Sequence, residues 1–387
     1  MKYVYADYAA TTPVDKRVLK VAKPYFSEKF GNPSSQHQKG LEAKKVLEES
    51  RMMVAKFFNC TPEEVIFTSG GTESENLAIK GICFSNHKFG KHVIISSVEH
   101  ASVDSSADFL EKQGFEISRI PVNRECFIDT DALRLLIRDD TILISVMYVN
   151  NEIGSIQPIS KISEIIQQIN TERQKDGKHK IMFHVDGEAG SIYLDFNVNK
   201  LGVDSISVNG SKVYSLKGVS ALFIRNGTGI ATQICGGGQE SMIRGGTENI
   251  PAIVSLAKAL SLSEAEREVN TSKVSSLKKR FISSVLKEIP CARINTPANS
   301  VSNIVHVTFL SENKTDIIKN LDNMGICVSS GSACASNKNK HSTVLSAMGF
   351  SEKEMGTSVR FSFGKYNSKS DIKYIIKSLK KYFKNAF

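Results

Sequence analysis

The sequence lacks any apolar run that approaches the roughly 18 residues of a membrane-spanning helix. Its N-terminus, from Met1 to Asp7, also lacks the basic start, apolar stretch and small-residue cleavage site of a secretory signal. We therefore expect a protein of the cytoplasm without a membrane partner.

Paired cysteines are absent as well. The seven cysteines are scattered, odd in number and nowhere spaced as Cys-x-x-Cys, which excludes a disulfide framework or a metal site of that pattern. The formal net charge is +10, but no basic run is interleaved with aromatic residues as in a nucleic-acid surface. We expect neither a metal site nor direct contact with nucleic acid.

The 387 residues exceed what one hydrophobic core usually supports, so about two domains are expected. Strand-like runs alternate with amphipathic segments, a pattern that predicts an α/β domain with a mainly parallel sheet. The expected strands are Val65–Ser69, His92–Ser96, Ile142–Val146, Ile181–Val185, Ser205–Val208 and Ala221–Ile224.

The stretch Ile253–Val285 reads as one long helix, and the remainder has the mixed pattern of a smaller α+β unit. We expect a large domain over residues 14–255. Residues 1–13 and 256–387 should form the small domain.

A glycine-rich turn follows the first expected strand. Gly70, Gly71 and Thr72 lead into a helical stretch, and free backbone N–H groups at a helix N-terminus suit a phosphate. An ordinary helix cap has the same appearance, so this motif alone does not establish a phosphate site.

Polar residues also follow the other strands, and in open α/β sheets ligands bind beyond the carboxyl ends of the strands. A lysine directly after a strand, with a carboxylate, an imidazole and a phosphate cradle nearby, favours covalent binding of pyridoxal phosphate. An acidic partner keeps the ring nitrogen of that cofactor protonated. The residues in question are Glu99-His100, Asn150-Asn-Glu152, Asp186 and Asn209-Gly-Ser-Lys212.

Ten motifs distributed over the chain carry a resemblance to a known family. They are Tyr5-Ala-Asp-Tyr-Ala-Ala-Thr-Thr-Pro13, Gly31-Asn-Pro-Ser-Ser35, Phe67-Thr-Ser-Gly-Gly-Thr-Glu-Ser74, Glu99-His100, Val149-Asn-Asn-Glu-Ile-Gly154, His184-Val-Asp186, Gly236-Gly-Gly-Gln-Glu240, Arg244-Gly-Gly-Thr247, Ser329-Ser-Gly-Ser-Ala-Cys334 and Val359-Arg-Phe-Ser362. In this order they resemble the cysteine desulfurases of the NifS/IscS type, within the class V aminotransferase-like enzymes.

The resemblance implies a homodimer of fold-type I pyridoxal-phosphate transferases, with a mainly parallel seven-stranded sheet and a smaller α+β domain. Lys212 resembles the lysine that holds the cofactor, Asp186 its ring-nitrogen partner and His100 the stacking residue. The other implied cofactor contacts are Gly71, Thr72, Asn151, Asn209, Ser211 and, from the second subunit, Thr247.

The same resemblance implies a reaction. Asn151 and Arg360 would orient L-cysteine, since an arginine fork suits a carboxylate. Lys212 would remove the Cα proton, and Cys334 would attack the substrate sulfur, leaving alanine and a persulfide for a sulfur-acceptor protein.

The chain also departs from the family pattern. Where the family has Asp-Ala-x-Gln, this chain has Asp186-Gly-Glu-Ala189, so the glutamine that contacts the cofactor oxygen is missing. Asn209 and Ser211 replace a serine and a histidine that contact the phosphate, and Ser215-Leu-Lys-Gly218 replaces Gly-Pro-Lys-Gly. Each lost contact costs about 1 to 3 kcal/mol of cofactor binding.

Three hypotheses follow: a desulfurase, another class V reaction such as transamination or β-elimination, and a weakly active paralogue that acts mainly as a binding partner. Cys334 favours the first over the second, and Lys212 with Asp186 argues against the third. The sequence leaves open whether the acceptor serves iron-sulfur cluster assembly or thiolation, and whether selenocysteine is preferred.

Overall fold

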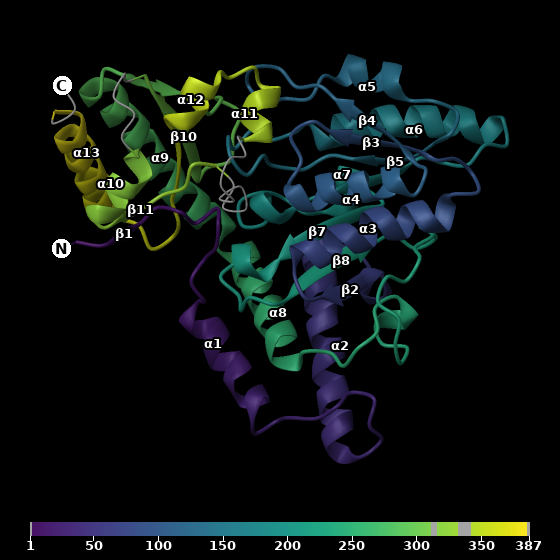
Figure 1. Ribbon diagram of the computed structural model, residues 1–387. Helices are drawn as coiled ribbons and strands as arrows, with labels where there is room; N and C mark the ends of the chain where they lie inside the picture. The colour runs from purple at the N-terminus through teal and green to yellow at the C-terminus, as the bar shows by residue number, and fades with distance from the viewer. Residues whose placement is uncertain (1, 311–315, 332–341, 385–387) are drawn as a thin grey trace.

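A seven-stranded sheet forms the centre of the computed structural model, which describes residues 2–310, 316–331 and 342–384 (Figure 1). The strand order is β2-β8-β7-β6-β5-β3-β4, and β8 alone runs antiparallel to its neighbours. The strands are β2 (Val65–Thr68), β3 (His92–Ser96), β4 (Glu116–Ile120), β5 (Thr141–Ser145), β6 (Met182–Val185), β7 (Ser205–Asn209) and β8 (Ser220–Ile224). The predicted mainly parallel seven-stranded sheet is therefore confirmed.

Helices cover both faces of this sheet, which explains why its central strands read as apolar runs without alternation. Every residue of β3, β5 and β6 is buried. The helices of this region are α1 (Lys16–Ala22), α2 (Gln38–Phe58), α3 (Gly71–Asn86), α4 (Ala101–Lys112), α5 (Thr130–Leu136), α6 (Ile159–Lys175), α7 (Val198–Leu201) and α8 (Ile250–Ala265), with short 3₁₀ turns η1 (Lys23–Phe26), η2 (Pro62–Glu64), η3 (Glu188–Gly190), η4 (Gly210–Lys212) and η5 (Glu240–Met242).

A second, smaller group of elements combines the N-terminus with the C-terminal third of the chain. An antiparallel sheet has the order β12-β10-β9, and β1 pairs in parallel with β11. Its elements are β1 (Val4–Tyr5), α9 (Arg267–Glu288), β9 (Ala292–Ile294), β10 (Ile304–Phe309), α10 (Ile317–Asn323), β11 (Ile326–Cys327), α11 (Thr343–Ala347), α12 (Glu352–Gly356), β12 (Ser358–Ser362) and α13 (Lys369–Lys384).

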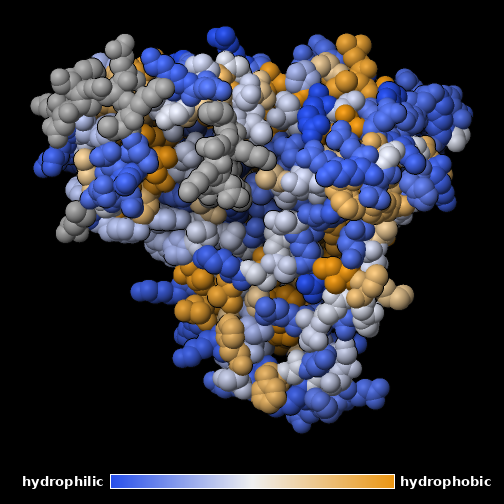
Figure 2. All heavy atoms as spheres, viewed as in Figure 1, coloured by the Kyte–Doolittle hydropathy of each residue, from blue (hydrophilic) through white to orange (hydrophobic). Residues whose placement is uncertain are grey.

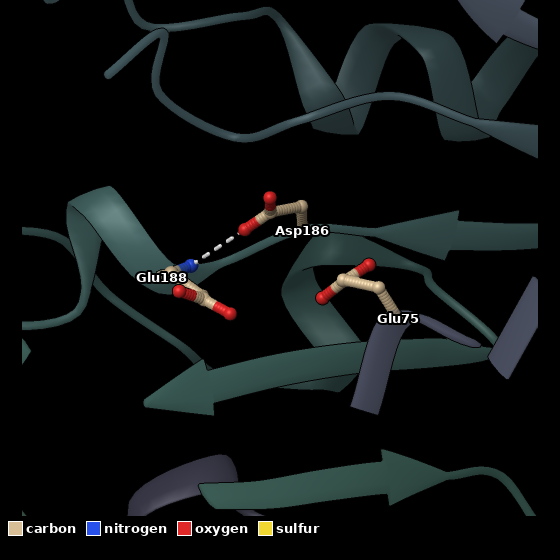
Figure 3. A group of neighbouring side chains, drawn as sticks. All are labelled: Glu75, Asp186 and Glu188. Carbon is tan, nitrogen blue, oxygen red and sulfur yellow. Dashed lines mark hydrogen bonds between the residues drawn. The ribbon is translucent and has the colours of Figure 1, made fainter. Parts of the chain in front are cut away.

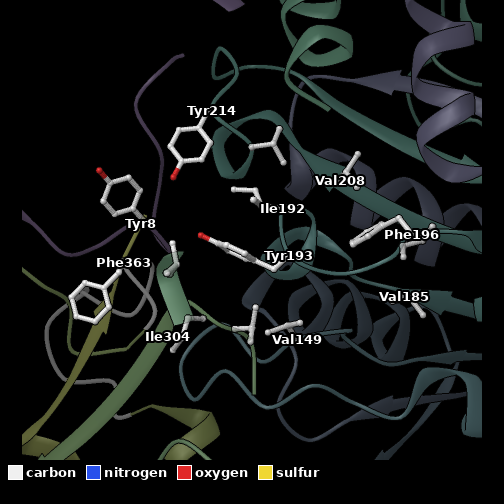
Figure 4. Close-up of a cluster of buried hydrophobic side chains, with 14 of the residues drawn as sticks. Tyr8, Val149, Val185, Ile192, Tyr193, Phe196, Val208, Tyr214, Ile304 and Phe363 are labelled. Atoms are coloured by element: carbon white, nitrogen blue, oxygen red, sulfur yellow. The ribbon is translucent and has the colours of Figure 1, made fainter. Parts of the chain in front are cut away.

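One hydrophobic core joins the two groups (Figure 4). Val185 and Val208 contribute to it from the large sheet, Ile304 contributes from β10, and Tyr193 and Tyr214 lie between them. This shared core holds the strand ends of the large sheet in a fixed position against the small sheet.

Two expectations from the sequence need correction or completion. The single helix expected over Ile253–Val285 is wrong, because the chain turns at Glu266, where α8 ends and α9 begins. Helix α8 packs on α1 and α2, whereas α9 packs on α13 and the small sheet, so one straight helix could not serve both regions. Strand β4 was not predicted, since this partly exposed edge strand has only one fully buried residue.

Among the described residues, no helix combines the length and apolar character that a membrane crossing requires.

Candidate active site

The carboxyl ends of the parallel strands surround a small pocket of about 90 Å³. His100 follows β3, Asn151 follows β5 and Asp186 follows β6, while Lys212 lies in η4 directly after β7. The full lining consists of Ala9, Ala10, His100, Met147, Asn151, Asp186, Glu188, Ala189, Lys212 and Arg360. Residues that are distant in sequence therefore meet at one edge of the sheet.

Lys212 is positioned by the N-terminal segment. Its Nζ donates hydrogen bonds to the carbonyl oxygens of Ala9, at 2.9 Å, and Ala10, at 2.7 Å. The turn that carries it begins at Asn209, whose side chain accepts a hydrogen bond from the backbone N–H of Ser211. A primary amine is thus presented to the pocket.

Asp186 and His100 flank this amine. Asp186 is 5% exposed, and its Oδ1 accepts the backbone N–H of Glu188 at 3.0 Å. The ring of His100 is oriented by Ser102, whose Oγ lies 2.7 Å from Nδ1. Burial lowers the pKa of His100, and Lys212 lowers it further, against an opposing effect of Asp186. The imidazole is therefore neutral at pH 7, which suits stacking on a ring.

Arg360 extends from β12 into the pocket. Its side chain is almost fully buried, and it donates to the carbonyl oxygen of Asn151 at 2.8 Å and to Oδ1 of Asp7 at 2.9 Å. Among the described residues, Nε of Arg360 has no hydrogen-bond partner. A buried guanidinium nitrogen with an unused donor favours an anionic ligand such as a carboxylate.

The predicted phosphate contacts Gly71, Thr72, Asn209 and Ser211 do not line the pocket itself, but Gly71 and Asn209 lie against Glu188, which does. Helix α3 begins at Gly71, and its N-cap residue is Gly70, which has no side chain to satisfy the first backbone N–H groups. Asn209 donates a hydrogen bond from Nδ2 to Oε2 of Glu188 at 3.0 Å. Thr72, at the second position of the helix, is exposed.

Thr247 is not part of the pocket lining within the described chain. It is exposed and lies next to Arg244 and Asn249 in a different hollow. The structure therefore does not bring Thr247 to the other predicted cofactor contacts within one chain.

Three carboxyl groups lie close together at the pocket, and the sequence did not predict this cluster (Figure 3). Glu75 of α3, Asp186 and Glu188 each place an oxygen within 4.8 Å of the others. Burial, with the nearby charges of Asp186 and Glu75, raises the pKa of Glu188 to about 8. Burial also raises the pKa of Glu75 well above its usual range, and Asp186 adds to this effect.

Glu75 is paired with a histidine that the sequence did not single out for this purpose. Its Oε2 lies 2.6 Å from Nε2 of His184, and both side chains are fully buried. Burial lowers the pKa of His184 to about 4, so the imidazole is neutral at pH 7 and is joined to the carboxyl group by a hydrogen bond. The helical pattern of the sequence could have indicated that Glu75 is a charged residue on a buried face. It could not have indicated the partner, because His184 lies 109 positions away.

Cys334 lies outside the described residues, but the two ends of its segment are described. Gly331, before Cys334, lies against Glu152, since a Cβ added at Gly331 would stand 2.6 Å from Oε2 of Glu152. Ser342, after Cys334, donates a hydrogen bond from Oγ to the same oxygen at 2.7 Å. Ser329, just before this segment, exchanges backbone hydrogen bonds with Arg360. Both ends of the segment are thus held beside the pocket.

The residues present fit pyridoxal phosphate. The pocket offers an amine at Lys212, a carboxylate at Asp186, a neutral imidazole at His100 and a donor at Arg360 that has no partner within the described part of the chain. The uncapped start of α3 supplies backbone N–H groups of the kind that bind phosphate. One feature is unusual for an anion site, namely the carboxyl group of Glu188 beside that helix start.

Comparison with known proteins gives a consistent result. The chain matches the class V aminotransferase family over residues 4–375. It is 43% identical to a cysteine desulfurase IscS of Dictyoglomus turgidum, over 98% of this chain and 94% of the relative. It is 40% identical to a cysteine desulfurase IscS 1 of Archaeoglobus fulgidus, over 97% of this chain and 95% of the relative.

Solved structures show the same likeness. A NifS-like protein superimposes with a TM-score of 0.92 at 32% identity, covering 99% of this chain and all 100% of that one. The protein SspA, solved in complex with cysteine, gives a TM-score of 0.82 at 34% identity, over 94% of this chain and 100% of its own. From the pocket, the fold and these relatives together, the chain belongs to the class V aminotransferase family, a family of pyridoxal-phosphate enzymes.

Proposed function

We propose that this chain is a cysteine desulfurase, which converts L-cysteine to L-alanine and passes the sulfur to Cys334. The observation that carries the proposal is the junction between Arg360 and Ser329. The residue that suits a substrate carboxylate and the start of the cysteine-bearing segment are hydrogen-bonded neighbours. The relatives named cysteine desulfurase, at 40% and 43% identity, support the same activity.

Substrate binding is assigned to Arg360 and Asn151. The carboxylate of L-cysteine pairs with the guanidinium of Arg360, whose Nε lacks a partner among the described residues. Because Asp7 and the Asn151 carbonyl already hold the other two nitrogens, the guanidinium plane is fixed before the substrate arrives.

Lys212 and Asp186 are assigned to the chemistry at the α-carbon. Bound pyridoxal phosphate withdraws electrons from the substrate's Cα–H bond. Asp186 supplies the negative charge that keeps the ring nitrogen protonated. Lys212 would hold the cofactor, and its free amine would take the α-proton on Nζ. His100 would cover one face of the ring, and Gly71, Thr72, Asn209 and Ser211 would hold the phosphate end.

Cys334 is assigned to sulfur transfer. Three Cα–Cα steps lead from Gly331 to Cys334, so the chain can carry the Cα of Cys334 no more than about 11 Å from that anchor. The thiolate of Cys334 attacks the substrate sulfur, the substrate C–S bond breaks, and the carbon product takes up a proton to become alanine. One cysteine and one enzyme thiol give one alanine and one enzyme persulfide, so the atoms balance.

We also propose a homodimer in which Thr247 of one copy reaches the pocket of the other. Thr247 is exposed and lies outside its own chain's pocket lining. Hydrophobic residues gather on the surface of α1, α2 and the segment between them (Figure 2). Phe26 and Phe30 there are 60% and 62% exposed, which is typical of an interface.

The remaining assignments follow from the same proposal. Residues 14–255 form the cofactor domain, and residues 1–13 and 256–387 form the domain that carries Cys334. The persulfide is delivered in the cytoplasm to an acceptor protein that serves either iron-sulfur cluster assembly or thiolation.

The product of L-cysteine tests this function. The purified protein with bound pyridoxal phosphate should form alanine in a ratio of one to one with sulfide when a thiol reductant is present. Without the reductant, alanine formation should slow after about one turnover, because Cys334 remains a persulfide. Pyruvate and ammonia in place of alanine would show β-elimination and overturn the proposal.

A pair of cysteine variants provides the control. Cys334→Ala should stop alanine formation, whereas Cys327→Ala should leave it unchanged, since the Cys327 thiol bonds to the Tyr3 hydroxyl outside the pocket. Alanine formation at the original rate by Cys334→Ala would contradict the mechanism.

A further inference from the structure

Glu188 occupies a place that a phosphate-binding pocket does not ordinarily give to an acid. It is half-buried and lines the same pocket as His100, Asp186 and Lys212. Its backbone N–H is fixed by Asp186, so the side chain has a defined starting point (Figure 3).

The carboxyl group of Glu188 lies between the two proposed phosphate contacts. Oε2 accepts a hydrogen bond from Asn209 at 3.0 Å. On the other side, a Cβ built on Gly71 would stand only 1.3 Å from Oε1. The carboxyl group therefore fills the space that any residue other than glycine would need at the start of α3.

Gly71, Glu188 and Asn209 thus form one unit. Gly71 makes room for the carboxyl group, Asn209 bonds to it, and Glu188 fills the space between them. The three positions are separated by up to 138 residues (209 minus 71), so only the fold brings them together.

The charges around Glu188 oppose its ionisation. Asp186 after β6 and Glu75 on α3 both disfavour a negative charge on it, while Lys212 on η4 and the hydrogen bond from Asn209 favour one. His184 is hydrogen-bonded to Glu75, and the pocket is also lined by His100, at the N-cap of α4, and by Arg360 of β12. Burial and the two acids prevail, and they raise the pKa of Glu188 to about 8.

We propose that Glu188 controls cofactor retention: in its neutral, protonated form it admits the phosphate of pyridoxal phosphate, and in its ionised form it repels that phosphate. This inference rests on the proposed function only in requiring that the pocket binds pyridoxal phosphate. A dianionic phosphate bound at Gly71 and Asn209 would lie next to the carboxyl oxygens. One bound proton is therefore linked to cofactor binding.

Binding of pyridoxine 5′-phosphate and of pyridoxine tests this directly. Neither compound has an aldehyde, so neither can bond to Lys212, and they differ only in the phosphate. Kd is measured by equilibrium dialysis between pH 7 and 9.5, on the apo form of the full chain, on Glu188→Gln and on the control Asp104→Asn. Asp104 is another carboxyl whose pKa burial raises, but it lies outside the pocket lining.

We expect Kd for pyridoxine 5′-phosphate to rise about tenfold per pH unit above pH 8 in the unmodified protein and in Asp104→Asn, since one proton is lost. Glu188→Gln should lack this rise, and pyridoxine should lack it with all three proteins. Parallel curves for the unmodified protein and Glu188→Gln would overturn the proposal, as would an equal rise for pyridoxine. Neither of these results would bear on whether the protein produces alanine from cysteine. The proposal for Glu188 and the proposed desulfurase function can therefore fail separately.

A second pair of variants tests the contact with Gly71 at pH 7. Gly71→Ala should weaken binding of pyridoxine 5′-phosphate at least tenfold, because its Cβ displaces the Glu188 carboxyl group into the pocket. In the Glu188→Ala background, the same change should weaken binding less than about threefold. An equal loss in both backgrounds would show that Glu188 does not occupy this space and would overturn the proposal.

Discussion

The substrate end and the phosphate end of the pocket are built differently. At the substrate end, Lys212, Asp186, His100 and Arg360 are the residues that the resemblance to cysteine desulfurases predicted, and each is held by hydrogen bonds to other parts of the chain or by burial. At the phosphate end, Ala189, Asn209 and Ser211 depart from the pattern of that resemblance, and Glu188 lies between Gly71 and Asn209.

This difference separates chemistry from cofactor retention. In the function proposed above, the residues at the substrate end determine which bonds are made and broken. The residues at the phosphate end determine how tightly the cofactor is held, and there the chain has an acid with a raised pKa, Glu188. Changes at the substrate end should therefore alter turnover, and changes at the phosphate end should alter cofactor affinity and its dependence on pH.

The largest effect is expected at Lys212. Lys212→Ala should reduce alanine formation at least about 10³-fold, because it removes both the covalent attachment of the cofactor and the proton acceptor. Lys217→Ala is the matched control, since Lys217 bonds to the carbonyl of Thr12 and does not line the pocket. Borohydride reduction and peptide mapping should place the cofactor on Lys212, and its appearance on Lys217 would end this assignment.

Arg360 should give the next largest effect. Arg360→Lys should raise the KM for cysteine about 10- to 100-fold, because one ammonium cannot bond to Asp7, the Asn151 carbonyl and a carboxylate in one plane. The control is Arg293→Lys, a surface change at an arginine that pairs with Glu354. Steady-state kinetics measure both, and an unchanged KM in Arg360→Lys would remove Arg360 from the substrate site.

The free energy of unfolding of the apo protein should depend on pH because of the raised pKa of Glu188 at the phosphate end. The folded pKa of Glu188, about 8, lies above the value of about 4.3 in the unfolded chain. Between these values the folded protein holds a proton that the unfolded chain has lost, so the contribution of Glu188 to stability falls as the pH rises through this window.

Glu188→Gln cannot ionise and should escape this loss. After allowance for its partial exposure, we expect the free energy of unfolding of Glu188→Gln, relative to the unmodified protein, to rise by about 2 kcal/mol between pH 5 and pH 9. Urea unfolding at the two pH values measures the difference. A constant difference would show that Glu188 ionises alike in the folded and unfolded states.

The smallest effect is expected from restoring the family residues. Ala189→Gln combined with Ser211→His should tighten binding of pyridoxal phosphate about five- to thirtyfold, since one or two hydrogen bonds are regained at about 1 kcal/mol each. Cofactor dialysis measures the change. An unchanged affinity and absorbance spectrum would mean that neighbours such as Glu188 already compensate for the missing contacts.

Much of the substrate end could be predicted because its signals are local. Each expected strand of the large sheet is present with its ends shifted by one residue at most, and a polar residue directly after a parallel strand reaches the ligand edge in this architecture. His100, Asp186 and Lys212 therefore meet as the strand pattern indicated.

The phosphate end could not be predicted in the same way, because its partners are close only in space. Glu188 was seen as a departure from a motif, but nothing in the sequence shows that its carboxyl group lies against Gly71. The break between α8 and α9 has the same origin, since the helical pattern continues through Glu266 while the packing partners change.

The mass of the Cys334 peptide after incubation with L-cysteine without reductant tests the desulfurase mechanism most directly. We expect a gain of one sulfur, about 32 Da, on that peptide, because the persulfide is the covalent intermediate. The gain should be absent in Lys212→Ala and should be reversed by a thiol reductant. An unmodified Cys334 peptide while alanine accumulates, or sulfur found only on another cysteine, would contradict it.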